Sequence, residues 1–242
     1  MKKILSFLTV LLFSSSALAE DITNPFYMPM KNKMLSETSV SYTKDKYKYS
    51  GMTDTVEQTV LNEDFSFGVS DRFSLTGSLG NRFEASGEKT NVYWGIGGTY
   101  AFYFENNPEA LLQIGASYSQ EGGHRDLEAF VRAGYAADAV ILPYAEFRFL
   151  QPINYGKDVN EPVFGVRVAG YSMIKEIVGV RAGVDFVYAH EAPRQQSYDV
   201  FGEIEYMVSE KIAVGVEGSY LFHDTGADTS GFSVGANVKI AF

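Results

Sequence analysis

Three histidines are the residues best suited to hydrolytic chemistry, because the chain has no cysteine to serve as a thiol nucleophile or zinc ligand. A serine hydrolase needs its serine within hydrogen-bond reach of a histidine that a third polar group orients. Ser219 shares a strand face with His223, but a separation of four residues places them ~13 Å apart. His124 and His190 face differently, which argues against a three-histidine metal site. We therefore expect no catalytic residue, no metal and no cofactor, with a lipid hydrolase or protease as the less favoured alternative.

Charged residues at alternate positions form the second candidate site, and their chemistry would be the selection of solutes by charge. Nine of them fall on the polar faces of consecutive segments: Arg132, Glu146, Arg148, Arg167, Arg181, Asp185, Glu203, Glu205 and Glu217. Fixed charges around a water-filled passage determine which solutes enter it. Such groups also pair across neighbouring strands, because unpaired charge in a partly dry interior is costly. These residues are predicted to line a lumen, as a selective wall or as paired structural groups.

The segments that position these residues have a period of two. In the last segment the apolar positions are Phe232, Val234, Ala236, Val238, Ile240 and Phe242, and the residues between them are polar or small. The segments 92–104, 178–188 and 212–222 repeat this alternation. Alternation of this kind predicts strands with one apolar face.

Turn signals divide the chain at regular intervals into these strands. Tight turns are expected at 70–72, 106–108, 137–138, 175–176 and 209–210, and longer polar connections at 50–54, 85–90, 121–126, 154–161, 191–196 and 224–230. The two sets alternate, which predicts about twelve strands of roughly ten residues or more, long enough to cross a membrane at a tilt. An even number of strands places both termini on the side of the tight turns.

The first nineteen residues predict a secretory signal peptide. Met1-Lys2-Lys3 is a basic start, residues 4–12 are apolar, and cleavage is expected between Ala19 and Glu20 after a small-residue pattern. The apolar run is shorter than the ~20 residues of a membrane-spanning helix. The mature chain is therefore expected to be exported.

Composition favours a membrane barrel over a soluble sandwich. Aromatic residues make up 14% of the chain, and they collect near strand ends, as in the interfacial girdles of membrane barrels. The polar strand faces are rich in Gly, Ser and Ala mixed with charge, which suits a lumen wall. The formal net charge of −10 argues against a nucleic-acid partner, since phosphate binding needs a basic surface.

The C-terminal strand resembles the assembly signal of bacterial outer-membrane β-barrel proteins, the superfamily of porin-like and OmpA-like barrels. The resemblance is carried by Val238, Ile240 and the terminal Phe242, with Ile240 standing where that family usually has an aromatic residue. It implies an all-β, antiparallel, up-and-down transmembrane barrel in the outer membrane. It also implies outer-membrane lipids, lipopolysaccharide and the barrel assembly machinery as partners. No particular member of the superfamily is indicated.

The function predicted from these features is a narrow porin-like channel for small solutes. About 8 strands leave a filled interior and 16 to 18 leave an open channel, so twelve falls between. Small neutral residues on the third to fifth and twelfth strands favour a passage. The alternative is a closed structural or adhesion barrel without conductance, and the oligomeric state is left open. The barrel is expected over 35–242, preceded by a periplasmic leader, 20–34, that either enters the periplasmic mouth or stays loose.

Overall fold

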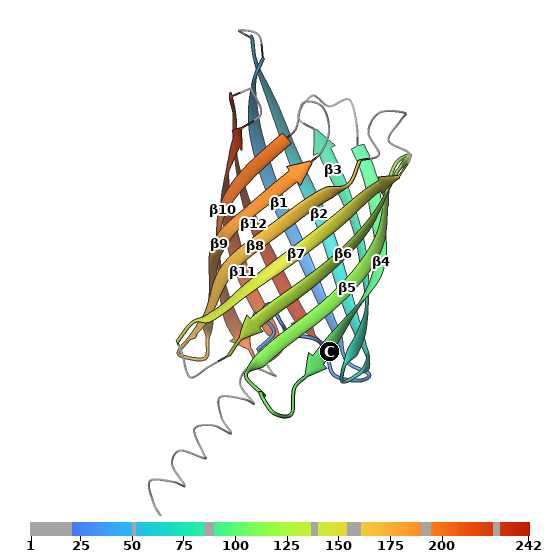
Figure 1. The fold of residues 1–242 in the computed structure, drawn as a ribbon, viewed down its shortest axis with the longest axis vertical. Helices are drawn as coiled ribbons and strands as arrows, with labels where there is room; N and C mark the ends of the chain where they lie inside the picture. Colours follow the sequence, from blue (N-terminus) through green and yellow to red (C-terminus); the bar gives the residue numbers. More distant parts are fainter. Residues whose placement is uncertain are drawn as a thin grey trace, which may run out of the picture.

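The computed structural model describes residues 21–49, 52–84, 90–136, 140–153, 161–189, 195–224 and 228–242. They form one closed barrel of antiparallel strands in which each strand pairs with the next and β1 pairs with β12 (Figure 1). The predicted all-β, up-and-down barrel of twelve strands is therefore confirmed. The signal peptide, its cleavage site between Ala19 and Glu20, and His190 lie outside the described residues.

The strands fall close to the predicted segments, and β1 begins one residue before the expected start of the barrel. They are β1 (Met34–Tyr49), β2 (Met52–Ser70), β3 (Phe73–Glu84), β4 (Thr90–Tyr103), β5 (Ala110–Glu121), β6 (His124–Tyr135), β7 (Leu142–Ile153), β8 (Val163–Ile174), β9 (Val178–Ala189), β10 (Gln195–Ser209), β11 (Ile212–Asp224) and β12 (Asp228–Ala241).

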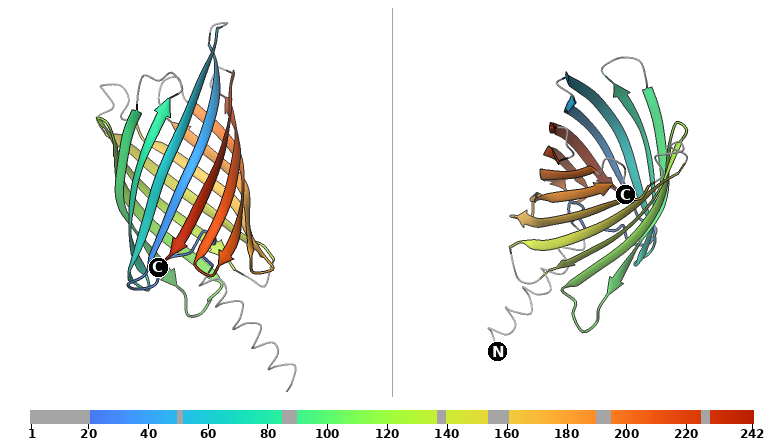
Figure 2. Two further views of the ribbon diagram at one scale, coloured as in Figure 1. Left: turned by 180° about the vertical axis from the view of Figure 1, so that it is seen from behind. Right: turned by 45° about the horizontal axis from the view of Figure 1, so that its top comes forward.

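The two ends of the barrel differ. At one end, which we call the turn end, short connections join β2 to β3 and β8 to β9. In the β8–β9 connection, Lys175 and Glu176 adopt left-handed backbone conformations. The C-terminus lies at this end (Figures 1 and 2). At the opposite, loop end, β1 and β2 are the longest strands and rise beyond the others.

The alternation of the sequence separates an apolar outside from a polar inside. Outward aliphatic side chains are widely exposed, with Val168 at 60%. Inward positions hold buried polar groups such as Glu146, which is 5% exposed. Burying apolar side chains in a core would reverse this pattern, so the exposed apolar belt is the surface that lipid covers. Among the described residues, no helix is long and apolar enough to cross a membrane.

The barrel is closed by the pairing of β1 with the C-terminal strand β12, and Phe242 extends this pairing to the turn end. The backbone N–H of Phe242 donates to the carbonyl of Met34 at 2.8 Å, and the N–H of Met34 donates back at 3.4 Å. From there β1 and β12 pair continuously, with Thr38 opposite Val238. In a membrane every strand-edge hydrogen bond must be made internally, because lipid offers no alternative partner. The C-terminal strand is thus the element that removes the barrel's free edges.

Phe242→Asp or deletion of Phe242 is expected to lower the yield of inserted barrel while export continues. Either change removes an aromatic group at the membrane interface next to the closing hydrogen bonds, and Asp places a charge there. The heat-dependent shift of gel mobility in membrane fractions measures insertion. Val140→Asp, at a residue 83% exposed and outside the strands, is the control and should insert normally. Normal insertion of both Phe242 variants would show that the terminal residue is ordinary wall.

Candidate functional site

The nine charged residues predicted to line the lumen lie on the inward faces of six consecutive strands. Arg132 is on β6, Glu146 and Arg148 on β7, Arg167 on β8, Arg181 and Asp185 on β9, Glu203 and Glu205 on β10, and Glu217 on β11. The structure brings eight of them into two groups of ion pairs and places Glu217 beside Gly235.

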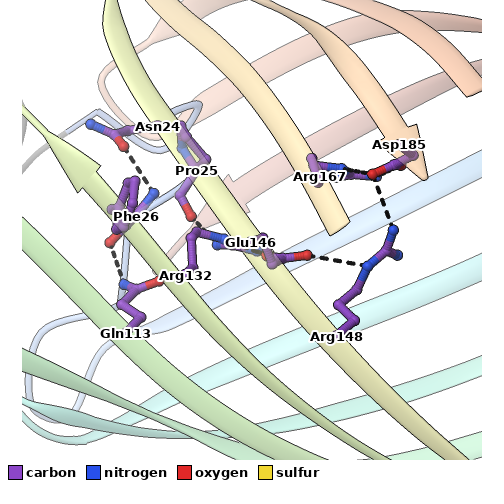
Figure 3. A network of polar contacts seen from close by, with 9 residues as sticks. All are labelled: Asn24, Pro25, Phe26, Gln113, Arg132, Glu146, Arg148, Arg167 and Asp185. Atoms are coloured by element: carbon purple, nitrogen blue, oxygen red, sulfur yellow. Dashed lines mark hydrogen bonds and ion pairs between the residues drawn. The ribbon is translucent and has the colours of Figure 1, made fainter. Parts of the chain in front are cut away.

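The first group is a chain of alternating charges across β6 to β9 (Figure 3). Arg132 pairs with Glu146 at 2.5 Å, and Arg148 lies 3.5 Å from the other oxygen of that carboxylate. The Arg148 side chain also passes over β8 and lies 3.1 Å from Asp185. Arg167 donates two guanidinium hydrogen bonds to the same carboxylate, at 2.9 and 2.5 Å. Two carboxylates are thus shared among three arginines, which leaves this group with excess positive charge.

The second group links β9 and β10 to β12. Arg181 forms an ion pair with Glu203, whose second carboxylate oxygen accepts a hydrogen bond from Asn237 at 3.1 Å. Lys239 lies 2.8 Å from Glu205. Both carboxyls are almost fully buried, so their pairing offsets part of the cost of holding charge away from water.

Several residues in these contacts were missed by the sequence interpretation. The twelfth strand was expected to belong to a neutral wall, and this is wrong because Lys239 and Asn237 point inward there. Glu37 on β1 joins them, accepting from Asn237 at 3.2 Å and lying 3.8 Å from Lys239. The alternation that placed Ser233 and Gly235 on the inner face also places residues 237 and 239 there, so the signal was present.

Small residues on β3 to β5 do not all leave open space. The ring of Tyr93 covers Gly80, and the ring of Phe130 covers Gly115, in each case where a Cβ atom would stand. Gly97 lies close to Ser117 and Thr76 on the neighbouring strands. The neutral wall is therefore partly a set of slots for aromatic rings, and the lumen is narrower than small side chains alone would suggest.

The segment before β1 enters the turn end of the barrel. The carbonyl of Phe26 accepts a hydrogen bond from Gln113 on β5 at 2.7 Å, and the carbonyl of Pro25 accepts one from Arg132 (Figure 3). The Phe26 ring meets Tyr144 edge-on with 5.9 Å between centroids, and it lies 5.9 Å from the Arg132 guanidinium. Arg132 therefore joins the charge network to the N-terminal segment.

A second anchor lies at the start of the same segment. The Tyr171 hydroxyl donates to Asp21, and it lies 2.6 Å from the hydroxyl of Thr23. Asp21 also accepts from the backbone N–H and the hydroxyl of Thr23, which is only 2% exposed. Thr23 packs where a Cβ atom at Gly179 would stand, so a larger residue at position 179 requires the segment to shift. The segment was expected either to enter the mouth of the barrel or to stay loose. The contacts of Asp21 and Thr23 place it inside the mouth.

A cavity of about 150 Å³ remains in the lumen, lined by members of both charge networks. Its wall includes Arg167, Arg181, Asp185, Asp199, Phe201, Glu203, Glu217, Ser219 and Ser233. That volume holds several water molecules, and charged and hydroxyl groups around it supply their partners. The interior is therefore partly hydrated between paired charges.

The histidines were weighed for hydrolysis and metal binding, and two of them are described. His124 begins β6, and His223 follows Ser219 by four residues on β11. Within the described ranges, no group of three or more His, Asp or Glu side chains is arranged to hold a metal ion.

Comparison with known proteins defines the class by fold. No protein-family model and no curated protein matches the sequence. Among solved structures, the COG4313 outer membrane channel from Pseudomonas putida F1 superposes with a TM-score of 0.70 at 8% identity, covering 89% of this chain and 97% of that one. The NanC porin gives 0.60 at 11% identity, with 84% and 98% covered.

The translocator domain of the autotransporter NalP from Neisseria meningitidis also matches, with a TM-score of 0.58 at 8% identity and coverage of 100% and 98%. Sequence identities this low show a shared fold and nothing about shared function. The chain has the fold of bacterial outer-membrane β-barrel proteins, and its structural neighbours include channels, porins and a translocator domain.

Arg181→Met is expected to lower the free energy of unfolding by about 2 to 4 kcal/mol, because it leaves the buried Glu203 carboxylate without its cation. The double variant Arg181→Met with Glu203→Gln should recover part of that loss, since no unpaired charge remains. Urea unfolding of the refolded protein in detergent, followed by fluorescence of the single tryptophan, measures both. Arg72→Met, at an exposed turn, is the control and should change little. Equal losses for the single and double variants would contradict the pairing.

Proposed function

We propose that this protein is a narrow outer-membrane channel for small solutes, with a charge-lined lumen that the N-terminal segment constricts at the turn end. The observation that carries the proposal is the interior of the barrel. A closed barrel that served only as a scaffold would be best filled by apolar packing, whereas here buried carboxylates and partly exposed arginines surround a cavity. Channels and porins among the structural neighbours support the same class.

The outer membrane is the compartment that fits this surface. An apolar belt between aromatic residues suits lipid, and the closing strand carries Val238, Ile240 and Phe242 in the pattern that resembles the assembly signal. In this orientation the turn end faces the periplasm and the projecting β1 and β2 hairpin faces outward. The assembly machinery and the surrounding lipids, lipopolysaccharide included, are then the partners of the barrel wall.

The lumen should favour cations over anions. Beyond the nine predicted residues, register places further acids inward: Glu37 opposite Lys239, Asp64 opposite Ser78, Glu128 opposite Ser117 and Asp199 opposite Asp185. Acidic side chains on the inner faces therefore outnumber basic ones. The arginine-rich network on β6 to β9 is a local exception near the constriction. A solute would meet positive charge at the narrow end and negative charge beyond it.

Planar-bilayer recording on the purified mature protein tests the channel directly. We expect small discrete conductance steps with a preference for cations. Arg148→Ala with Arg167→Ala should strengthen that preference, because two fixed positive charges leave the lumen. This pair is chosen over Arg132, which also holds the N-terminal segment. The absence of steps would favour the closed structural or adhesion barrel, and lipid release or peptide cleavage by the protein would favour the hydrolase or protease alternative.

The constriction makes a separate prediction. A variant lacking residues 21–27 should conduct severalfold better than the full chain, because the segment leaves the mouth. Thr23→Cys with Gly179→Cys should lock the segment in place. A Cβ atom at residue 179 lies 3.0 Å from that of Thr23, so a small shift allows a disulfide. Conductance of the oxidised double variant should stay low, and the Thr23→Cys single variant should not respond to oxidation. Identical conductance in all these forms would mean that the segment does not restrict flow.

A further inference from the structure

One carboxylate lies on the lipid-facing side of the barrel. Glu63 is on β2, between inward-facing Asn62 and Asp64, and its side chain shares the outer face with Leu61 and Phe65. Among the outward positions described, the other ionisable residues of the wall lie toward the loop end: Lys44, Lys46, Glu57 and Arg125. Glu63 is therefore the one ionisable group that the described strands place within the apolar belt.

Register fixes the depth of Glu63 near the middle of that belt. It lies four residues along β2 from Phe67, and Thr38, its partner in register, lies four residues along β1 from Tyr42. Four residues of a tilted strand span about 10 Å of membrane depth. Phe67 and Tyr42 thus stand about 10 Å away on either side, with Phe65 between Glu63 and Phe67. Charged groups at this depth are costly, rare and usually tied to an interaction.

Two hydroxyl groups surround this carboxylate. Thr38 donates to one oxygen of Glu63 at 2.5 Å, and Ser36 donates to the other. Both hydroxyls stand on the outer face of β1, beside Val40. The two hydroxyl donors and the carboxylate acceptor thus form a polar notch, a small polar patch at one depth within an otherwise apolar surface.

We propose that the outer strip formed by Ser36, Thr38, Val40, Leu61, Glu63 and Phe65 is the contact surface between two copies of this chain in the membrane. Both copies insert in the same direction, so a two-fold axis between them runs parallel to the membrane normal. Residues at equal depth then meet. Thr38 and Ser36, which donate to Glu63 within one copy, exchange these hydrogen bonds with Glu63 of the other copy, and lipid is excluded from all of them.

Two features of the structure favour a second copy over another occupant. First, the notch is self-complementary, because Thr38 and Glu63 are opposite each other in register and exchange roles across a two-fold axis. Second, the strip continues into the β1 and β2 hairpin, which rises beyond the other strands (Figure 2). This hairpin carries the outward ion pair of Lys44 with Glu57. The opposite wall, with Val166 and Val168 on β8, offers only apolar side chains at comparable positions.

Cysteine cross-linking tests the surface without background, because the chain contains no cysteine. Val40→Cys places a thiol on the strip, at a residue 42% exposed, and Val168→Cys places one on the opposite wall as the matched control. The purified mature protein is refolded into phosphatidylethanolamine and phosphatidylglycerol vesicles at a low protein-to-lipid ratio and treated with a short bis-maleimide. We expect a cross-linked dimer from Val40→Cys and monomer from Val168→Cys.

Adding Glu63→Leu to Val40→Cys should lower the cross-linked fraction about tenfold, in line with the loss of two polar contacts per dimer. Glu63→Gln keeps an acceptor of the same shape and should retain the dimer. Thr38→Val removes a donor with little change in shape and should weaken it. Heat-dependent gel mobility shows that each variant has formed its barrel. Equal cross-linking at residues 40 and 168, or a Glu63→Leu barrel that cross-links as before, would overturn the proposal.

Discussion

The whole structure depends on the requirement that a sheet in lipid have no free edge. Backbone N–H and C=O groups without a partner are too costly in hydrocarbon, so the strands must close on themselves. Pairing of β1 with β12 meets this requirement, and the hydrogen bonds between Met34 and Phe242 complete it at the turn end. Closure then gives the wall two different faces. The outer face meets lipid and needs apolar side chains, and the inner face surrounds a confined, partly hydrated space and needs polar ones.

The inner face combines charge pairing with an apolar cluster at the turn end, formed by Leu142, Tyr144, Ala169 and Tyr171. Arginines and carboxylates from neighbouring strands satisfy one another, and Asn237 carries the second network towards β1. The same side chains do more than one task. Arg132 neutralises Glu146 and also holds the carbonyl of Pro25, so the electrostatic balance of the wall and the position of the N-terminal segment are coupled. A barrel built this way keeps its interior polar while the inward-facing arginines of β6 to β9 are paired with carboxylates.

Sequence alone was sufficient for the strands, because alternation with a period of two is strict wherever one face meets lipid. It placed all nine charged residues, from Arg132 to Glu217, on the face where the structure has them. The position of the N-terminal segment was left open, since residues 21–33 lack any period and their partners lie far along the chain, as Tyr171 does for Asp21. Glu63 was overlooked for a different reason. Its depth in the membrane depends on the register between β1 and β2, which the alternation of a single strand does not contain.

The place of the N-terminal segment also bears on the order of assembly. Asn237 and Glu37, which meet across the closing seam, are 200 residues apart, so this is the pairing with the largest entropic cost and the last that a growing sheet is expected to form. The segment that reaches Arg132 and Tyr171 precedes β1 directly and lies within the ring that the seam completes. The first residues of the described chain are thus enclosed by a ring that β12 completes. A sheet curling around its own beginning would have a template against its inner face, which would give the nascent barrel a preferred curvature before its edges join.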